Sequence, residues 1–192
     1  MLTFTLDTSC INAIDKSRDE AGFIQNLMDA HIKRIAEVGV VAISVFEDQH
    51  KDGHLERFST FKEHIESLGL EKLELLYPMF YWDVTFWDAS IKADDKAHTL
   101  ESKVHNILYP DIPFLWTDYC HEHGIDPESE TLDEEWRNAK CAVQSYWCHA
   151  IHGRHVFVTS NKNFYDESKK KKLLELAGGY IETPECAAAL VH

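Results

Sequence analysis

HVFVTSNKNF, residues 155–164, runs an apolar strand signal directly into a cluster of small polar side chains. The apolar residues at 156–158 are typical of a strand that is buried on both faces of a sheet. The polar residues that follow must lie at the carboxyl end of this strand, where the two amides can hold a loop or a metal-bound phosphate. These residues are Thr159, Ser160, Asn161 and Asn163.

Strand and helix signals alternate along the chain. This alternation favours an α/β fold with a mostly parallel sheet covered on both faces, in which ligands bind beyond the carboxyl ends of the strands. Strands are predicted at residues 2–6, 40–45, 70–77, 156–159 and 180–182. Helices are predicted at residues 20–37, 55–68, 94–108, 114–124, 131–151 and 166–177, and a short one is predicted from residue 183 onward.

The helix at 20–37 shows the 3.6-residue apolar spacing that is typical of one buried stripe. Gly39 is expected to end this helix before the strand at 40–45 begins. His31 is expected on the buried stripe rather than at a metal site. The apolar residues of the stripe are Ile24, Leu27, Met28, Ile32 and Ile35.

Residues 79–130 follow the alternating pattern least well. Within them the run MFYWDVTFW, residues 79–87, concentrates aromatic rings. Rings at this density favour a core, and the stacking of bases is the less favoured alternative. Asp83 within this run and Asp88 directly after it are further acidic residues that a metal site could recruit.

Composition limits the classes of function. The chain has 192 residues, 33 acidic against 19 basic, and a formal net charge of -14, so any contact with nucleic acid must be local. An acidic surplus also suits magnesium or manganese, although most of these charges are expected simply to solvate the surface. No apolar run reaches the roughly 18 to 20 residues that span a bilayer, so no membrane segment is expected.

Five cysteines, at positions 10, 120, 141, 148 and 186, do not have the even spacing of a disulfide framework. The N-terminus shows no signal-peptide pattern. Both features predict reduced thiols and a cytoplasmic location. GxGxxG, Walker, GxSxG and CxxC motifs do not occur, so the sequence does not support nucleotide-cofactor, hydrolase-elbow or thioredoxin functions.

Oxygen-bearing side chains follow three of the predicted strands. Asp7 ends the first strand, Glu47 lies just past the second and Asn161 lies just past the fourth. Parallel strands bring these positions to one edge, where they predict a seat for a divalent cation with open coordination positions. The alternative for Asp7, taken alone, is that it caps the helix that follows it.

In their order along the chain, four segments resemble PIN-like domains. LTFTLDTSCINAI at 2–14 is similar to their opening strand, and VVAISVFED at 40–48 lies where their second strand and acidic residue belong. VFVTSNKNF at 156–164 and KLLELAGGYIETPE at 172–185 resemble their closing segment. The resemblance implies a single domain over residues 1–192, folded as a three-layer α/β/α sandwich, with a family-atypical insertion at about 79–130.

Many PIN-like domains are ribonucleases that use magnesium or manganese held by three or four acidic residues. The resemblance places the first acid at Asp7 and the second at Glu47, or at Asp48 if the helix begins later. The third falls near Ala142, where no carboxylate occurs, and the fourth falls on Asn161, which offers only a carbonyl oxygen. Neutral residues at these positions predict weak metal affinity.

Further residues are expected to support the site. Ser9 is expected to assist the metal or its waters, and Thr159 and Asn163 to hold the loop or a phosphate. Lys162 is expected to contact substrate. Lys140 either replaces a cation beside Asp7 and Glu47 or is an ordinary exposed lysine. The four lysines at 169–172 are a local positive charge for RNA or a solvated helix face.

The preferred interpretation is therefore a metal-dependent ribonuclease of PIN-like type that cleaves RNA phosphodiester bonds. The alternative is an inactive PIN-like module that binds RNA or protein. Its partners would be RNA, an antitoxin-like protein or a second copy of the chain as a homodimer. A zinc site at Cys148, His149 and His152, or in CHEH at 120–123, is not favoured because the spacing matches no standard zinc motif.

Overall fold

The computed structural model describes residues 1–43, 58–79, 90, 94–128 and 132–191, and the structural statements that follow concern these residues. Their strands form one five-stranded parallel sheet in the order β3-β2-β1-β4-β5. The prediction of an α/β fold with a mostly parallel sheet is confirmed. The strands are β1 (Thr3–Leu6), β2 (Glu37–Val41), β3 (Glu74–Leu76), β4 (Val156–Val158) and β5 (Tyr180–Glu182).

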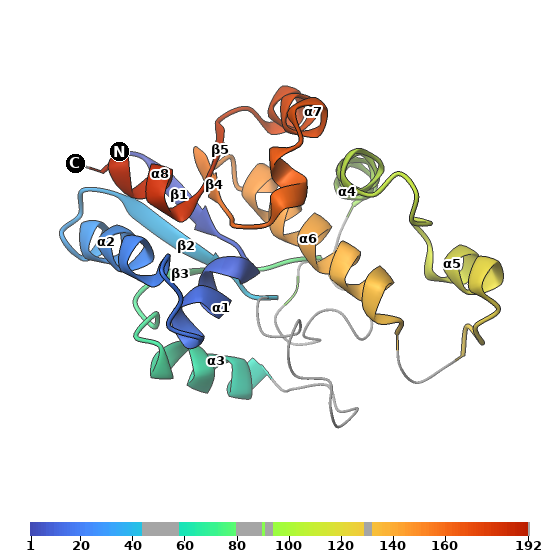
Figure 1. Cartoon of the computed structure of the whole chain (residues 1–192), viewed down its shortest axis with the longest axis horizontal. Coiled ribbons are helices and arrows are strands. Elements are labelled where there is room, and N and C mark those ends of the chain that lie inside the picture. The colour runs from blue at the N-terminus through green and yellow to red at the C-terminus, as the bar shows by residue number, and fades with distance from the viewer. Residues whose placement is uncertain (44–57, 80–89, 91–93, 129–131, 192) are drawn as a thin grey trace.

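Helices cover both faces of the sheet and complete a three-layer α/β/α arrangement (Figure 1). One group is α1 (Thr8–Asp15), α2 (Ala21–Ile32), α3 (Phe58–Ser67) and α8 (Pro184–Ala189). The other group is α4 (Asp95–Leu108), α6 (Glu134–Ile151) and α7 (Glu167–Ala177), with α5 (Trp116–His123) beyond α4 and the short 3-10 helix η1 (Lys162–Tyr165) before α7.

The strand order reverses at β1. The chain moves outward from β1 through β2 to β3, then returns to place β4 on the other side of β1. In a parallel sheet this reversal opens a crevice beyond the carboxyl ends of the two strands at the switch. Asp7 directly follows β1 and Thr159 directly follows β4, so the predicted site residues at these two strand ends lie at the switch point.

The boundary between α2 and β2 differs from the prediction. Helix α2 ends at Ile32, and Arg34 adopts a left-handed backbone with φ 59°, which turns the chain toward β2. Gly39 does not end the helix but lies inside β2, so the predicted end of the helix over 20–37 and the predicted start of the strand over 40–45 are wrong. Residues 44–45 of that strand lie outside the described residues. Ile32 and Ile35, expected on the buried stripe, are 56% and 54% exposed.

Arg154 explains why a glycine stands inside β2. A side chain at Gly39 would place its Cβ 3.2 Å from Arg154 Nη2. That nitrogen donates to the carbonyl oxygens of Phe4 at 3.0 Å and Glu37 at 3.1 Å, and Nη1 donates to Glu74 at 2.8 Å. The Glu74 carbonyl oxygen and Leu76 Cδ1 would lie equally close, at 3.2 Å. A glycine therefore suits this position because β3 and a buried guanidinium both approach it, whereas local sequence rules predict a helix end there.

Helix α6 is buried on almost every side rather than on one stripe. All its residues from Trp136 to His149 are buried except Asn138, whereas Ile151, expected on the apolar face, is 49% exposed. The helix begins with Asp133 as its N-cap, because the Asp133 carboxylate accepts from the Glu135 amide at 2.9 Å. Thr131, expected to cap this helix, lies outside the described residues.

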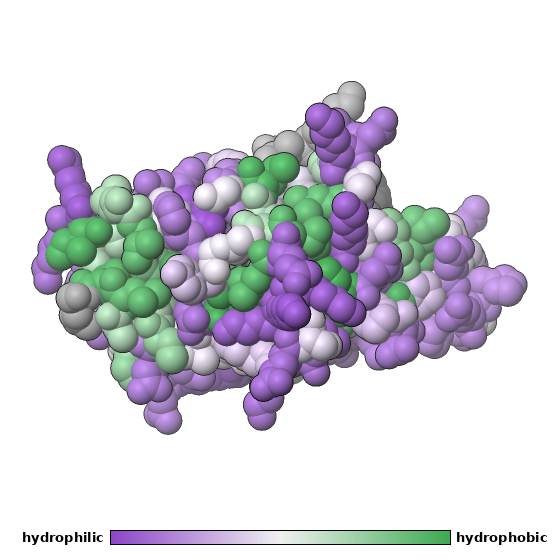
Figure 2. Space-filling model, turned by 90° about the horizontal axis from the view of Figure 1, so that it is seen from above, coloured by the Kyte–Doolittle hydropathy of each residue, from purple (hydrophilic) through white to green (hydrophobic). Residues whose placement is uncertain are grey.

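Hydrophobic side chains gather at the end of the molecule where α2, α8 and both termini lie (Figure 1, Figure 2). The residues that are exposed there are Met1, Ile32, Ile35 and Leu190. In the described ranges no helix is both long enough and apolar enough to cross a bilayer. The five cysteines are free thiols, of which Cys186 is exposed. A homodimer stays a prediction.

Candidate functional site

Asp7 is buried between the ends of β1 and β4 and receives four hydrogen bonds. Its Oδ1 accepts from the Ser9 amide at 2.9 Å, the Ser9 hydroxyl at 2.5 Å and the Cys10 amide at 3.3 Å. Its Oδ2 accepts from the Thr159 hydroxyl at 2.5 Å. Asp7 is therefore the N-cap of α1, as the alternative interpretation of the sequence held, and it also ties α1 to the end of β4.

The same hydroxyls hold the chain that leaves β4. Ser9 Oγ accepts from the Ser160 amide at 2.7 Å, and Thr159 Oγ1 accepts from the Asn161 amide at 3.0 Å. Each hydroxyl thus donates to Asp7 and accepts from the backbone of the β4 exit loop. The structure brings the predicted residues Asp7, Ser9 and Thr159 together in one network, in which all three act on the protein's own backbone.

Asn161 and Asn163 also serve the local fold. Asn161 Oδ1 accepts from the Asn163 amide at 3.0 Å and caps η1. Asn163 Nδ2 donates to the Leu108 carbonyl at 3.0 Å, while its Oδ1 accepts from Lys169 Nζ at 2.6 Å. Both amides hold loops, which is one of the two roles that the sequence predicted for them. Lys162 between them is exposed.

Burial raises the pKa of Asp7 above its ordinary value, and the hydrogen bonds from Ser9, Thr159 and Cys10 partly offset this effect. Burial, together with the Asp7 charge, raises the pKa of Cys10 well above its ordinary value. Its Sγ donates to the Val158 carbonyl at 3.3 Å. The thiol is therefore a neutral core group and no nucleophile.

The structure bears out neither of the two roles that the sequence suggested for Lys140. The side chain is buried rather than exposed, and its described ion pair is with Glu101 rather than with Asp7. It is 1% exposed, and its Nζ lies 2.8 Å from Oε1 of Glu101, which is itself fully buried on α4. Gln144 Nε2 donates to the same oxygen at 3.0 Å, and Gln144 Oε1 accepts from the Met79 amide at 3.1 Å. The ammonium also lies 3.8 Å from the centre of the Phe114 ring. Burial lowers the pKa of Lys140, and the Glu101 carboxylate opposes that shift.

The described residues do not fit a magnesium or manganese centre. Asp7 already accepts four hydrogen bonds, and the side-chain oxygen of Asn161 is engaged as a cap. Ala142, at the position expected for the third acid, is buried and has no ligand atom. Within the described ranges no three His, Cys, Asp or Glu side chains are grouped to bind a metal. Four further acids that the sequence suggested lie outside the described residues: Glu47, Asp48, Asp83 and Asp88.

Sequence reasoning missed the buried polar groups of α6. Four of its buried side-chain atoms have no hydrogen-bond partner: Arg137 Nε, Asn138 Oδ1, Ser145 Oγ and His149 Nε2. Ser160 Oγ at the end of β4 is in the same state. The sequence of this helix carries charged and polar residues on every face, although the strand that follows it is fully apolar. This combination could have indicated that some of these polar residues are buried. Glu101 gave no local signal, because it lies 39 residues from its partner Lys140.

The lysines at 169–172 divide into two pairs. Lys169 donates to the Leu108 carbonyl at 2.7 Å, and Lys170 donates to the Ile181 carbonyl at 2.6 Å. Lys171 and Lys172 are exposed. Half of this charge therefore secures α7 to its neighbours, and the other half faces solvent.

The cysteine and histidine residues near the end of α6 do not converge. Cys148 and His149 are buried, and His149 Nδ1 lies 3.1 Å from the Thr5 hydroxyl oxygen on β1. His152 Nδ1 lies 2.7 Å from the carbonyl oxygen of Cys148 on its own helix. These contacts place His149 in the core and leave the zinc interpretation without support from the geometry.

Stability should fall in mild acid because of His149. Burial lowers its pKa to about 3, whereas the unfolded chain titrates near 6.5. Between these two values the unfolded state binds one proton more, so we expect a loss of about 3 kcal/mol between pH 6.5 and pH 4. Urea unfolding at both pH values measures this loss. His149→Phe should not show this loss of stability between pH 6.5 and pH 4. An equal loss in that variant would show that His149 is not its cause.

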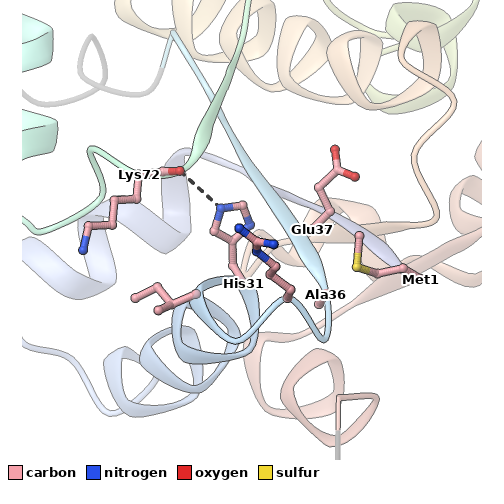
Figure 3. A pocket seen from close by; sticks show the side chains of 7 residues that line it. Met1, His31, Ala36, Glu37 and Lys72 are labelled. Carbon is pink, nitrogen blue, oxygen red and sulfur yellow. Dashed lines mark hydrogen bonds between the residues drawn. The ribbon is translucent and has the colours of Figure 1, made fainter.

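A pocket of about 410 Å³ lies at the other end of β2, lined by His31 and Lys72 among others (Figure 3). His31 Nδ1 accepts from the Val38 amide at 3.0 Å, and Nε2 lies 3.2 Å from the Lys72 carbonyl oxygen. The histidine is half-buried rather than part of the core stripe, and both of its nitrogens hold the fold. The pocket therefore offers no free catalytic group from His31.

No family model and no curated protein matches this sequence. Among solved structures, the chain is similar to one chain in the crystal structure of VapBC2 from Rickettsia felis bound to a DNA fragment from their promoter. The two chains are 12% identical, with 95% of this chain and 98% of that chain covered and a TM-score of 0.42. A likeness of this degree carries no conclusion about function.

Proposed function

We propose that the chain is a PIN-like module that binds RNA at the carboxyl edge of its sheet and does not cleave it. The observation that carries this proposal is the state of Asp7. Its carboxylate accepts four hydrogen bonds from α1 and the end of β4, so it acts as a cap and a tie between elements. A ligand at Oδ1 would have to displace bonds that start a helix.

The residues around Asp7 support the loss of cleavage. Hydrolysis with divalent cations requires several carboxylates that hold the cations and activate the attacking water. Ala142 supplies no oxygen, and Asn161 supplies a neutral one that is already bonded to the Asn163 amide. Lys140 and Glu101 form a buried ion pair with one another, so Glu101 is not available as a carboxylate for a cation.

Exposed cations in the chain that follows β4 favour RNA as the ligand. Lys162 directly follows Asn161 and is exposed, and Lys171 and Lys172 are exposed on α7. Because the whole chain carries a net charge of -14, these local charges would have to act at short range, and binding should weaken steeply with salt.

The second candidate is the metal-dependent ribonuclease, with magnesium or manganese held by Asp7 and Glu47 and assisted by Asn161. The location of Asp7 at the switch point favours it, and Oδ2 accepts only one hydrogen bond and so keeps a lone pair. Ser9, Thr159, Asn163 and Lys162 would then position the substrate. An antitoxin-like protein partner is compatible with the RNA-binding module and with the ribonuclease.

One assay separates these candidates. We expect fluorescent single-stranded RNA to bind with equal affinity in EDTA and in Mn²⁺, and to remain intact in both. Lys162→Gln should weaken binding about 2- to 5-fold, since one phosphate contact is lost, whereas Lys103→Gln on the exposed side of α4 should not. Manganese-dependent cleavage that Asp7→Asn abolishes would instead establish the ribonuclease.

A further inference from the structure

Arg137, in the first turns of α6, is a buried cation for which the described part of the chain offers no counter-ion. It is 7% exposed, and its Nε is fully buried without a hydrogen-bond partner. Its guanidinium forms no ion pair or hydrogen bond with any residue that the structure describes. A guanidinium is a planar cation that donates hydrogen bonds and accepts none, so only an acceptor or an anion can pair with it.

A second arginine shows what burial normally requires in this protein. Arg154 is 6% exposed, which is nearly the same burial. Its Nη nitrogens bond the Glu74 carboxylate at 2.8 Å and the carbonyl oxygens of Phe4 and Glu37 at 3.0 and 3.1 Å. Arg154 Nε is also buried without a hydrogen-bond partner, so the two arginines differ in their Nη nitrogens, and those of Arg137 have no partner among the described residues. Burying a charge without partners is unfavourable, so the Arg137 guanidinium is suited to pair with an anion.

The acidic residues near Arg137 are engaged elsewhere. Tyr119 donates to Asp133 at 2.8 Å and lies 3.4 Å from Glu135, so its hydroxyl holds both acids at the start of α6. Glu134, one turn before Arg137, is exposed. Glu101 binds Lys140 at 2.8 Å. Several carboxylates thus lie on the same or the neighbouring helix, and none of them neutralises this guanidinium.

The start of α6, which carries Arg137, lies toward the carboxyl edge of the sheet. Helix α6 runs antiparallel to β4, because His149 near its end meets Thr5 inside β1 and Gln144 meets the Met79 amide beyond β3. Arg137 lies two turns before Gln144 and so projects past the carboxyl edge of the sheet. Side chains on a helix tilt toward its N-terminus, which carries the guanidinium further in this direction.

We propose that Arg137 anchors a binding site for a phosphate monoester. Such a group is dianionic near neutral pH and presents two oxygens to the planar fork of a guanidinium. A side chain that is 7% exposed is reached by a terminal group more easily than by a continuous backbone. The phosphate belongs either to the 5′ end of RNA, which rests on the function proposed above, or to a small phosphate ester, which does not.

Inorganic phosphate is the first probe. Thermal unfolding at constant ionic strength, with chloride replaced by phosphate, should raise the Tm of the wild-type protein. Arg137→Gln should abolish the rise and weaken phosphate binding in calorimetry about 10- to 100-fold, the range for loss of charge-assisted hydrogen bonds. Arg18→Gln, the same change at an exposed arginine, should leave both unchanged.

The stability of Arg137→Gln in the absence of phosphate distinguishes a ligand-binding role of Arg137 from a structural one. Without phosphate, Arg137→Gln should be at least as stable as the wild type, because a buried unpaired charge is removed. Arg137→Lys should retain weaker binding, since the charge stays while the fork is lost. Equal stabilisation of wild type and Arg137→Gln by phosphate, or no stabilisation of the wild type, would overturn the proposal.

A comparison of RNA ends identifies the source of the phosphate. Short RNA with a 5′-phosphate should bind more tightly than the same RNA with a 5′-hydroxyl, and Arg137→Gln should remove the difference. If phosphate binds through Arg137 while the two RNAs bind equally, the site stands and belongs to a small phosphate ester, and the proposed RNA binding is unaffected. If neither RNA binds, the site still stands and only the proposed RNA function fails.

Discussion

Lys140→Met should lower the free energy of unfolding by about 3–5 kcal/mol, because it leaves the Glu101 carboxylate buried without its cation. Glu101 is fully buried, and the ammonium at 2.8 Å is removed while Gln144 Nε2 remains at 3.0 Å and His98 Nδ1, on the exposed side, at 3.7 Å. A neutral amide cannot compensate a buried negative charge. Urea unfolding at pH 7 measures the loss.

The matched change Lys103→Met removes an exposed lysine from the helix that carries Glu101 and should change stability by less than about 0.5 kcal/mol. The double variant Glu101→Leu/Lys140→Met should recover most of the stability, since replacing both members of a buried pair is often nearly neutral. A loss below about 1 kcal/mol for Lys140→Met alone would contradict the buried pair.

Asp7→Ala should destabilise the protein by about 2–4 kcal/mol. The change removes the cap of α1 and leaves the Thr159 hydroxyl, the Ser9 hydroxyl and two amides without their acceptor. Asp7→Asn should cost less, because one oxygen still accepts from the α1 amides and burial of a charge is avoided. Guanidinium unfolding of the two variants measures the difference.

Asp166 provides a matched control within the same chain. Its Oδ1 accepts from the Ser168 amide, the Ser168 hydroxyl and the Lys169 amide at 3.1, 2.9 and 3.0 Å, the same Asp-x-Ser capping pattern as at Asp7. Asp166 is exposed and begins α7. Asp166→Ala should therefore lower stability clearly less than Asp7→Ala. Equal losses would show that the tie between Asp7 and β4 contributes nothing.

The sheet and its layers were predictable because parallel strands buried on both faces produce continuous apolar runs. The stretch at 156–158 became β4, and the polar residues after it lie at the switch point. The boundaries of β2 were missed for a physical reason: Gly39 accommodates Arg154, which arrives from a segment 115 residues away in sequence. A local rule about glycine cannot detect such a contact.

The candidate site was predictable in place but less so in chemistry. An aspartate that begins Asp-Thr-Ser is compatible both with a metal ligand and with a helix cap, and the contacts of Ser9 and Thr159 that show the cap come from the structure. Lys140 was identified as a residue of interest, yet its partner Glu101 lies on another helix and carries no sequence signal. The unpartnered state of Arg137 is likewise visible only once the packing of α6 is known.

The central claim is that Asp7 ties the fold together and does not seat a catalytic cation. Titration of the wild-type protein with Mn²⁺ in an isothermal calorimeter tests it most directly. We expect no saturable binding up to millimolar Mn²⁺, because Asp7 is occupied by donors and neither Ala142 nor Asn161 supplies a carboxylate. One-site binding in the micromolar range that Asp7→Asn eliminates would contradict the claim.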